Sequence, residues 1–198
     1  MKPPPTPPPA VQAALKEWAA VAVAIRTGRQ SILLRAGGIA DPAGRFGFSH
    51  PWFWIYPTRF HESADRLVPE AMPFVESAAA EGNAIRSLDL LATLEPVQSE
   101  TVQWIDDRAV AERLAPMHIL APAVVRERFD YRQPGLAVAL VRVWRRREPH
   151  RIVETPAMEG CRSWVELPEP LECDASEPVL SDAAFEAERQ RFARLIGH

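Results

Sequence analysis

The residues best suited to binding a ligand are arginines grouped around one tryptophan. They are Arg142, Trp144, Arg145, Arg146, Arg147 and Arg151. Guanidinium groups contact phosphates and an indole ring stacks on a base, so this grouping favours nucleic acid as the ligand. Arg35, Arg59 and Arg162 would extend the surface if the fold brings them near. A solvated end of a strand would carry the same residues, so that interpretation stays open.

A second group of polar residues lies between the end of the strand expected over Ser31–Arg35 and residue 62. It consists of Arg35, His50, His61 and Glu62. These are the candidate catalytic residues of a nuclease-like or phosphoryl-handling enzyme, because imidazole and carboxylate groups transfer protons and a guanidinium stabilises negative charge. His50, His61 and Glu62, together with His118, also have the chemistry of metal ligands. An extended Pro51–Phe60 would hold His50 and His61 roughly 30 Å apart, at about 3.3 Å per residue. We therefore expect no metal site and no cofactor.

Paired glycines follow Arg35. Successive amides around Gly37 and Gly38 could form a nest for an anion beside the guanidinium. An ordinary turn, in which glycine supplies a positive φ, is the alternative. The candidate ligand-binding residues are Arg35, Gly37, Gly38, Arg142, Trp144, Arg145, Arg146, Arg147 and Arg162.

Two further chemistries find little support in the sequence. A Nudix-type hydrolase would need a glutamate-rich helix for Mg²⁺, but Glu70, Glu76 and Glu81 are spaced wrongly and Pro73 interrupts them. Cys161 precedes Arg162, whose charge would lower a thiol pKa. No base can be assigned to that thiol, and a packed cysteine near a turn is the simpler interpretation.

Composition limits the class of protein. The chain has 198 residues, is 47% hydrophobic and carries a net charge of -3, so it can bury a core and has no dominant basic field. Residues 1–10 contain six of its prolines and are expected to form a disordered tail. The start lacks a signal-peptide pattern, and the longest apolar stretch, Ala19–Ile25, is too short to span a membrane. We expect a cytoplasmic protein with reduced thiols and no membrane contact.

The pattern of apolar residues predicts many short elements. Residues 11–18 show helical spacing, and Ala19–Ile25 alternates like a strand that turns into a second strand at Ser31–Arg35. A helix continuing to Arg26 is the alternative. Further strands are expected over 46–56, 85–97, 136–144, 150–155 and 163–167, and further helices over 64–68, 74–81, 108–114, 123–129 and 181–196.

Several strings resemble one known family. They are LKEWAAVAVAIRTGRQSILLRAGGI (15–39), HPWFWIYPTRFHE (50–62), HI (118–119) and GCRSWVEL (160–167). In this order they resemble the prokaryotic domain of unknown function 1802, from about Leu15 to Asp182. That family more commonly has lysine where this chain has Ala36, and often glutamine where it has Glu62. The resemblance implies no activity. Some members are joined to restriction-endonuclease-like domains, which implies a context of restriction-modification.

These patterns predict one α+β domain over residues 11–198, with a mixed, mostly antiparallel sheet and flanking helices. The favoured function is an accessory module that binds an anionic ligand, above all nucleic acid. One alternative is an enzyme that uses the Arg35, His50 and His61 region. Another is a structural or partner-binding protein that uses the proline tail or the C-terminal helix.

Overall fold

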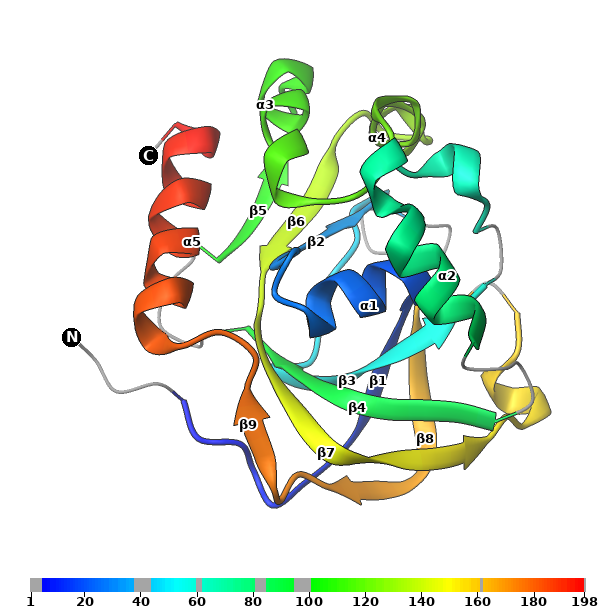
Figure 1. Cartoon of the computed structure of the whole chain (residues 1–198). Helices are drawn as coiled ribbons and strands as arrows, with labels where there is room; N and C mark the ends of the chain where they lie inside the picture. Colours follow the sequence, from blue (N-terminus) through cyan, green and yellow to red (C-terminus); the bar gives the residue numbers. More distant parts are fainter. Residues whose placement is uncertain are drawn as a thin grey trace.

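The computed structural model describes residues 5–37, 44–59, 62–80, 85–94, 101–160 and 162–197. It confirms an α+β domain built on a mixed, mostly antiparallel sheet (Figure 1). Gly38, His61 and Cys161 lie outside the described residues, as do residues 1–4 of the proline-rich tail.

The larger sheet has six strands in the order β8-β1-β3-β4-β7-β9. They are β1 (Ala10–Trp18), β3 (Trp52–Thr58), β4 (Ile85–Thr93), β7 (Arg142–Val153), β8 (Trp164–Glu172) and β9 (Ser176–Pro178). β1 and β3 run parallel, and the other neighbouring pairs are antiparallel. Leu15 pairs with Ile55 on one side and Trp164 on the other, so the second half of β1 lies between two strands.

The smaller sheet has three antiparallel strands in the order β2-β6-β5. They are β2 (Ile32–Arg35), β5 (Val102–Ile105) and β6 (Leu136–Leu140). The amide of Val141 donates to the Ser31 carbonyl at 2.8 Å, and there the chain passes from β6 to β7. The single strand expected over 136–144 is therefore two strands in two sheets. β5 has no counterpart among the expected strands.

Helices fill and cover the space between the sheets. In the described part of the chain they are α1 (Ala19–Arg26), α2 (Met72–Ala80), α3 (Arg108–Arg113), α4 (Pro122–Asp130) and α5 (Asp182–Ile196), with short 3₁₀ turns at Ala64–Arg66, Pro69–Ala71, Ala115–Met117 and Pro156–Met158. Figure 1 shows α1 near the centre of the molecule, with α2 beside it. None of the described helices is long and apolar enough to cross a membrane.

The predictions for residues 11–26 are wrong in both halves, because 11–18 form β1 and Ala19–Ile25 belong to α1. Pairing with β3 and β8 stabilises the extended chain of β1 although its apolar residues recur at helical spacing. All residues of α1 from Ala19 to Ile25 are buried, so no amphipathic period marks the helix. Its four alanines favour a helix intrinsically. The alternative of a helix ending at Arg26 gave the correct type of element.

Most other predicted elements are confirmed. The helices expected over 108–114, 123–129 and 181–196 are α3, α4 and α5. Asp107 caps α3 by accepting the amide of Ala109 at 2.8 Å, and Ser181 caps α5 by accepting that of Ala184 at 3.2 Å. The strand expected over 46–56 begins only at Trp52. β7 is longer than expected and places Arg145–Arg147 inside the strand instead of at its exit.

Candidate functional site

Charged side chains gather where β1 passes into α1, around the buried Glu17. The Glu17 side chain is 2% exposed, and its Oε1 accepts the backbone amide of Trp18 at 2.9 Å. The Nη2 of Arg35, from the end of β2, lies 3.7 Å from its Oε2. Arg35 also donates a hydrogen bond to the carbonyl of Lys16. A charge so far from water needs partners, and Arg35 is the nearest cation.

Arg128 of α4 approaches the same point from the other side. Its Nη1 donates to the Leu34 carbonyl at 2.8 Å, and its Cζ lies 4.8 Å from the centroid of the Trp18 ring. Burial of the guanidinium lowers the pKa of Arg128 to about 10, and the charges of Arg35 and Arg66 act in the same direction while Glu17 opposes them. Arg128 is therefore a second buried cation whose charge interacts favourably with that of Glu17.

Glu62 completes the group at the first turn of α1. It is half-buried, and both carboxylate oxygens lie 3.4 Å from the amide of Ala20. Burial raises the pKa of Glu62, and the charge of Glu17 raises it further, whereas the helix amides and Arg59 lower it. We call Glu17, Arg35, Glu62 and Arg128 the Glu17 cluster.

Aromatic rings lie beside this cluster, and we call them the aromatic rim: Phe46, Phe48, His50 and Trp164. The Phe46 ring stacks on Trp164 at 6.2 Å and lies edge-on to Phe48 at 5.0 Å. His50 lies edge-on to Trp164 at 4.8 Å, and the indole N–H donates to the Gly47 carbonyl at 3.1 Å. His50 is exposed, while Phe48 and Trp164 are half-buried, so part of the rim faces solvent.

Two contacts link the rim to the cluster. Arg35 holds its guanidinium 5.7 Å from the centroid of Phe46 while pairing with Glu17. The amide of Lys16 donates to the carbonyl of Ser163, next to Trp164, at 2.8 Å. Of the expected catalytic group, Arg35 contacts both Glu17 and Phe46, His50 contacts Trp164 of the rim, and Glu62 lies against the first turn of α1.

Four of the arginines of β7 lie elsewhere and pair with acids. Arg142 is buried and pairs with Asp182, and Arg146 pairs with Asp174. Arg145 lies 3.4 Å from Asp89, and Arg147, with its side chain 87% exposed, lies 3.9 Å from Glu177. These carboxylates offset much of the positive charge that the sequence suggested.

Trp144 does not present its ring to solvent. It is 5% exposed and packs 5.1 Å from Trp52, within the second apolar core on the other face of the larger sheet. Arg151 and Arg162 are exposed, and Arg162 lies two residues before Trp164 of the rim.

Gly37 is required by a close approach of two backbone segments. A Cβ at this position would lie 1.5 Å from the carbonyl oxygen of Gly44. Its φ is not positive, so the expected turn geometry does not explain this glycine. Gly37 holds the chain after Arg35 against the segment that leads to Phe46.

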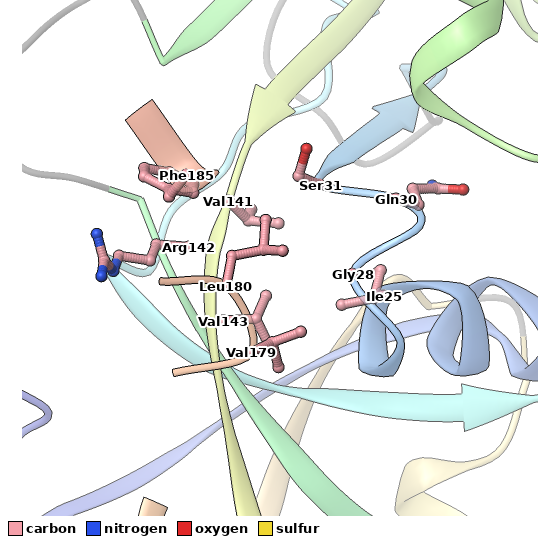
Figure 2. Close-up of a pocket in the computed structure, with 10 residues that line it drawn as sticks. All are labelled: Ile25, Gly28, Gln30, Ser31, Val141, Arg142, Val143, Val179, Leu180 and Phe185. Carbon is pink, nitrogen blue, oxygen red and sulfur yellow. The ribbon is translucent and has the colours of Figure 1, made fainter. Parts of the chain in front are cut away.

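The pocket drawn in Figure 2 lies apart from the cluster and the rim. It has about 250 Å³ of empty space, part of it open solvent, between the end of α1, the β6–β7 junction and the start of α5. Its walls are mainly Ile25, Val141, Val143, Val179 and Leu180. The guanidinium of Arg142 points away from these side chains (Figure 2), and Gln30 and Ser31 are the other polar residues of the lining.

His118, a candidate metal ligand, is buried and 1% exposed. Its Nδ1 accepts the amide of Leu120 at 3.1 Å. Burial lowers the pKa of His118 to about 4, and the charges of Arg128 and Arg29 add to the effect. Within the described ranges, no three of the histidine, cysteine, aspartate and glutamate side chains are grouped as metal ligands would be.

Glu17 and Arg128 were missing from the residues expected to form a site. The sequence predicts that Glu17 lies on a helix, where it would be an ordinary surface carboxylate. Only the burial of β1 turns it into a buried charge that needs partners. Arg128 lies on a correctly predicted helix, but its contacts with Trp18 and Leu34 join segments far apart in the sequence. A charged residue inside an otherwise apolar stretch, such as Glu17 in AALKEW, was the one available signal.

A family model described as "Domain of unknown function (DUF1802)" matches residues 14–191. No curated protein matches the chain. The crystal structure of ASCH from Zymomonas mobilis is similar at 17% sequence identity and a TM-score of 0.46, over 79% of this chain and 87% of that chain. Two mutant proteins of the same ASCH protein match at 16% identity, with TM-scores of 0.46 and 0.45, over 79% of this chain and 90% and 88% of theirs.

Proposed function

The chain belongs to the family called domain of unknown function 1802, and we propose that it binds single-stranded nucleic acid across the aromatic rim and the Glu17 cluster. The observation that carries this proposal is Arg35, which contacts Phe46 of the rim and Glu17 of the cluster at once. Single strands are bound by aromatic rings on which bases stack, beside cations that take the phosphates. Both parts are present here, next to each other.

The exposed cations beside the rim supply the phosphate contacts. Arg45 precedes Phe46 and holds its Cζ 4.8 Å from the Trp104 ring, and Arg162 precedes Trp164 by two residues. Both are exposed, and no described carboxylate is paired with either in an ion pair. Because the net charge of the chain is -3, nucleic acid is attracted only by this local surface and not by the protein as a whole.

Single strands are favoured over duplexes by the form of the rim. Phe48 and Trp164 are half-buried and the rings of the rim pack against one another, so a base can reach them only when it is unstacked from its own neighbours. The expected link to restriction-modification rests on the family resemblance alone and forms no part of the proposal.

Fluorescence anisotropy with labelled single- and double-stranded DNA and RNA, over a series of salt concentrations, tests the proposal. The wild type should bind single strands more tightly, and the double variant Arg45→Ala/Arg162→Ala should lower the salt slope by about two and weaken binding about tenfold or more. The matched control is Arg145→Ala/Arg146→Ala/Arg147→Ala on β7.

Each other outcome has a distinct meaning. Loss of binding only in the β7 variant would place the nucleic acid on β7, as the sequence first suggested. No binding of any strand at low salt would refute the proposal and favour a partner-binding protein. Shortening of the labelled strand on a denaturing gel, abolished by Glu62→Gln, would support the nuclease-like alternative.

A further inference from the structure

Resting on the proposed function, we infer that the bound strand continues beyond the aromatic rim onto residues 131–134, where Tyr131 stacks on a further base and Arg132 contacts a phosphate beside it. We call these four residues the Tyr131 loop. They lie between α4 and β6, and all four are exposed. Exposed aromatic rings and cations in succession are what binds a single strand.

The Tyr131 loop is held at its base by two contacts. The amide of Gly135 donates to the carbonyl of Phe129 at 2.8 Å, which closes the loop just before β6. A Cβ on Gly135 would lie 2.5 Å from the Trp104 ring, so the backbone rests directly on that indole. The loop is therefore fixed to the smaller sheet although its side chains reach solvent, and little ordering is required when a strand binds.

The same indole joins the loop to the rim. The Cζ of Arg45 lies 4.8 Å from the centroid of the Trp104 ring, and Arg45 directly precedes Phe46 of the rim. A Cβ on Gly44 would lie 3.2 Å from the Oε1 of Gln133, so the chain that leads to the rim touches the Tyr131 loop. A strand on the rim can therefore pass over this exposed arginine and reach the loop.

Tyr131 is available to a ligand because the apolar cores do not use it. It is 48% exposed and belongs to none of the hydrophobic clusters in the described part of the chain. The guanidinium of Arg132 lies 5.5 Å from the centroid of its ring. A ring that is half in solvent beside a cation offers a base a stacking surface and the adjoining phosphate a partner.

The backbone of Arg132 is in the left-handed region, where a glycine would fit at lower cost. Its φ is 61°, and Ala175 is the other non-glycine residue with a positive φ among those described. No described carboxylate forms an ion pair with Arg132, and the neighbouring Asp130 pairs with Arg108. The fold uses neither the charge nor the strained backbone of this arginine, which favours a role in binding.

The test is fluorescence anisotropy with labelled oligothymidine strands of about 4 to 16 nucleotides, the range of site sizes of single-strand-binding folds. Tyr131→Ala should weaken binding of the longest strands roughly five- to hundredfold, and the loss should grow with strand length. Tyr131→Phe keeps the ring and should recover most of the affinity. Arg132→Gly should lower the salt slope by about one.

Two variants serve as matched controls. Arg126→Ala removes an exposed arginine of α4 that pairs with Glu112, and it should bind strands of every length as the wild type does. Ala175→Gly relieves the other positive φ, between β8 and β9, and should likewise leave binding unchanged. Melting curves by circular dichroism show whether any variant loses affinity because it unfolds.

The outcomes separate this extension from the proposed function. If Arg45→Ala/Arg162→Ala weakens binding and Tyr131→Ala does not at any strand length, the extension is overturned and the rim remains the binding surface. A loss in Tyr131→Ala that is equal at all lengths, or that Arg126→Ala shares, would also overturn it, because stacking of one further base predicts neither. If no strand binds the wild type at low salt, the proposed function fails and the extension fails with it.

Discussion

The Nη2 of Arg35 lies 3.7 Å from the Oε2 of Glu17, whose side chain is only 2% exposed. The charge of Glu17 also favours the charged form of the buried Arg128, so one buried anion interacts with two cations. Removing one charge from a buried ion pair leaves the other charge without a partner, which lowers the free energy of unfolding by about 3–5 kcal/mol. The ion pair joins β1 to β2 and thus one sheet to the other.

We expect Glu17→Gln to lower the free energy of unfolding by about 2–4 kcal/mol, measured by urea denaturation. The amide oxygen of glutamine can still accept the Trp18 N–H, so the lost stability measures the contribution of the negative charge. The control is Glu127→Gln, because Glu127 is 61% exposed and pairs with Arg66 at the surface. That change should cost less than about 1 kcal/mol, and equal losses in the two variants would contradict the prediction.

His118 should make the protein sensitive to acid. Burial lowers the pKa of His118 from 6.5 to about 4 in the folded state, so the unfolded chain binds the extra proton between these values. Stability contributed by the neutral ring is present above pH 6.5 and is lost as the pH falls towards about 4. Over that range the free energy of unfolding should fall by roughly 3 kcal/mol, at about 1.4 kcal/mol per pKa unit.

Chemical denaturation at several pH values checks this, with His118→Asn as the comparison. Asparagine does not titrate, and its oxygen can still accept the amide of Leu120. The variant should therefore lose much of the pH dependence between pH 6.5 and about 4. Parallel curves for wild type and variant would show that His118 is not the titrating group.

Glu62 has the opposite dependence on pH. Its pKa is raised from 4.5 in the folded state, mainly by burial, so the stability that its proton contributes is complete below 4.5 and is lost as the pH rises through the raised value. Without ligand, Glu62→Gln should therefore stabilise the protein at neutral pH. The gain should be below about 1 kcal/mol, since water screens the half-exposed group. Thermal melts at about pH 7 and about pH 4 should show the gain only at the higher pH.

Arg142 should act in stability and not in binding. Its buried guanidinium pairs with Asp182 at the start of α5 and lies 5.1 Å from the centroid of the Phe185 ring. Arg142→Ala should cost about 3–5 kcal/mol and increase hydrogen exchange along α5. Arg147→Ala, at an 87% exposed side chain of the same strand, should change stability by less than about 0.5 kcal/mol.

Gly37→Ala should be destabilising although the φ of Gly37 is not positive. Its Cβ would lie 1.5 Å from the Gly44 carbonyl oxygen, so the backbone must move, and overpacking of this kind costs about 1–3 kcal/mol. Gly47→Ala is the matched control, because a Cβ there has no described atom within 4 Å. Circular dichroism melts compare the two, and equal melting temperatures would refute the close approach.

The sequence by itself determined the fold class, the family and the elements with strong local signals. Ser181 with the apolar stripe of α5, and Asp107 with α3, are local because a cap and a helical face involve residues within a few positions of one another. The strand Ile32–Arg35 was also evident from its apolar side chains. Arg35, His50 and Glu62 were selected for their chemistry before any contact was known.

Only the tertiary structure decided the rest. Residues 11–18 became a strand because β3 and β8 pair with them, and 19–26 became a helix because the core surrounds it, so the local pattern was overridden twice. The same contacts buried Glu17, brought Arg128 to it and turned Trp144 into the core. The free energy of a charged side chain depends on its burial and on its ion-pair partners. Both are determined by residues far away in the sequence.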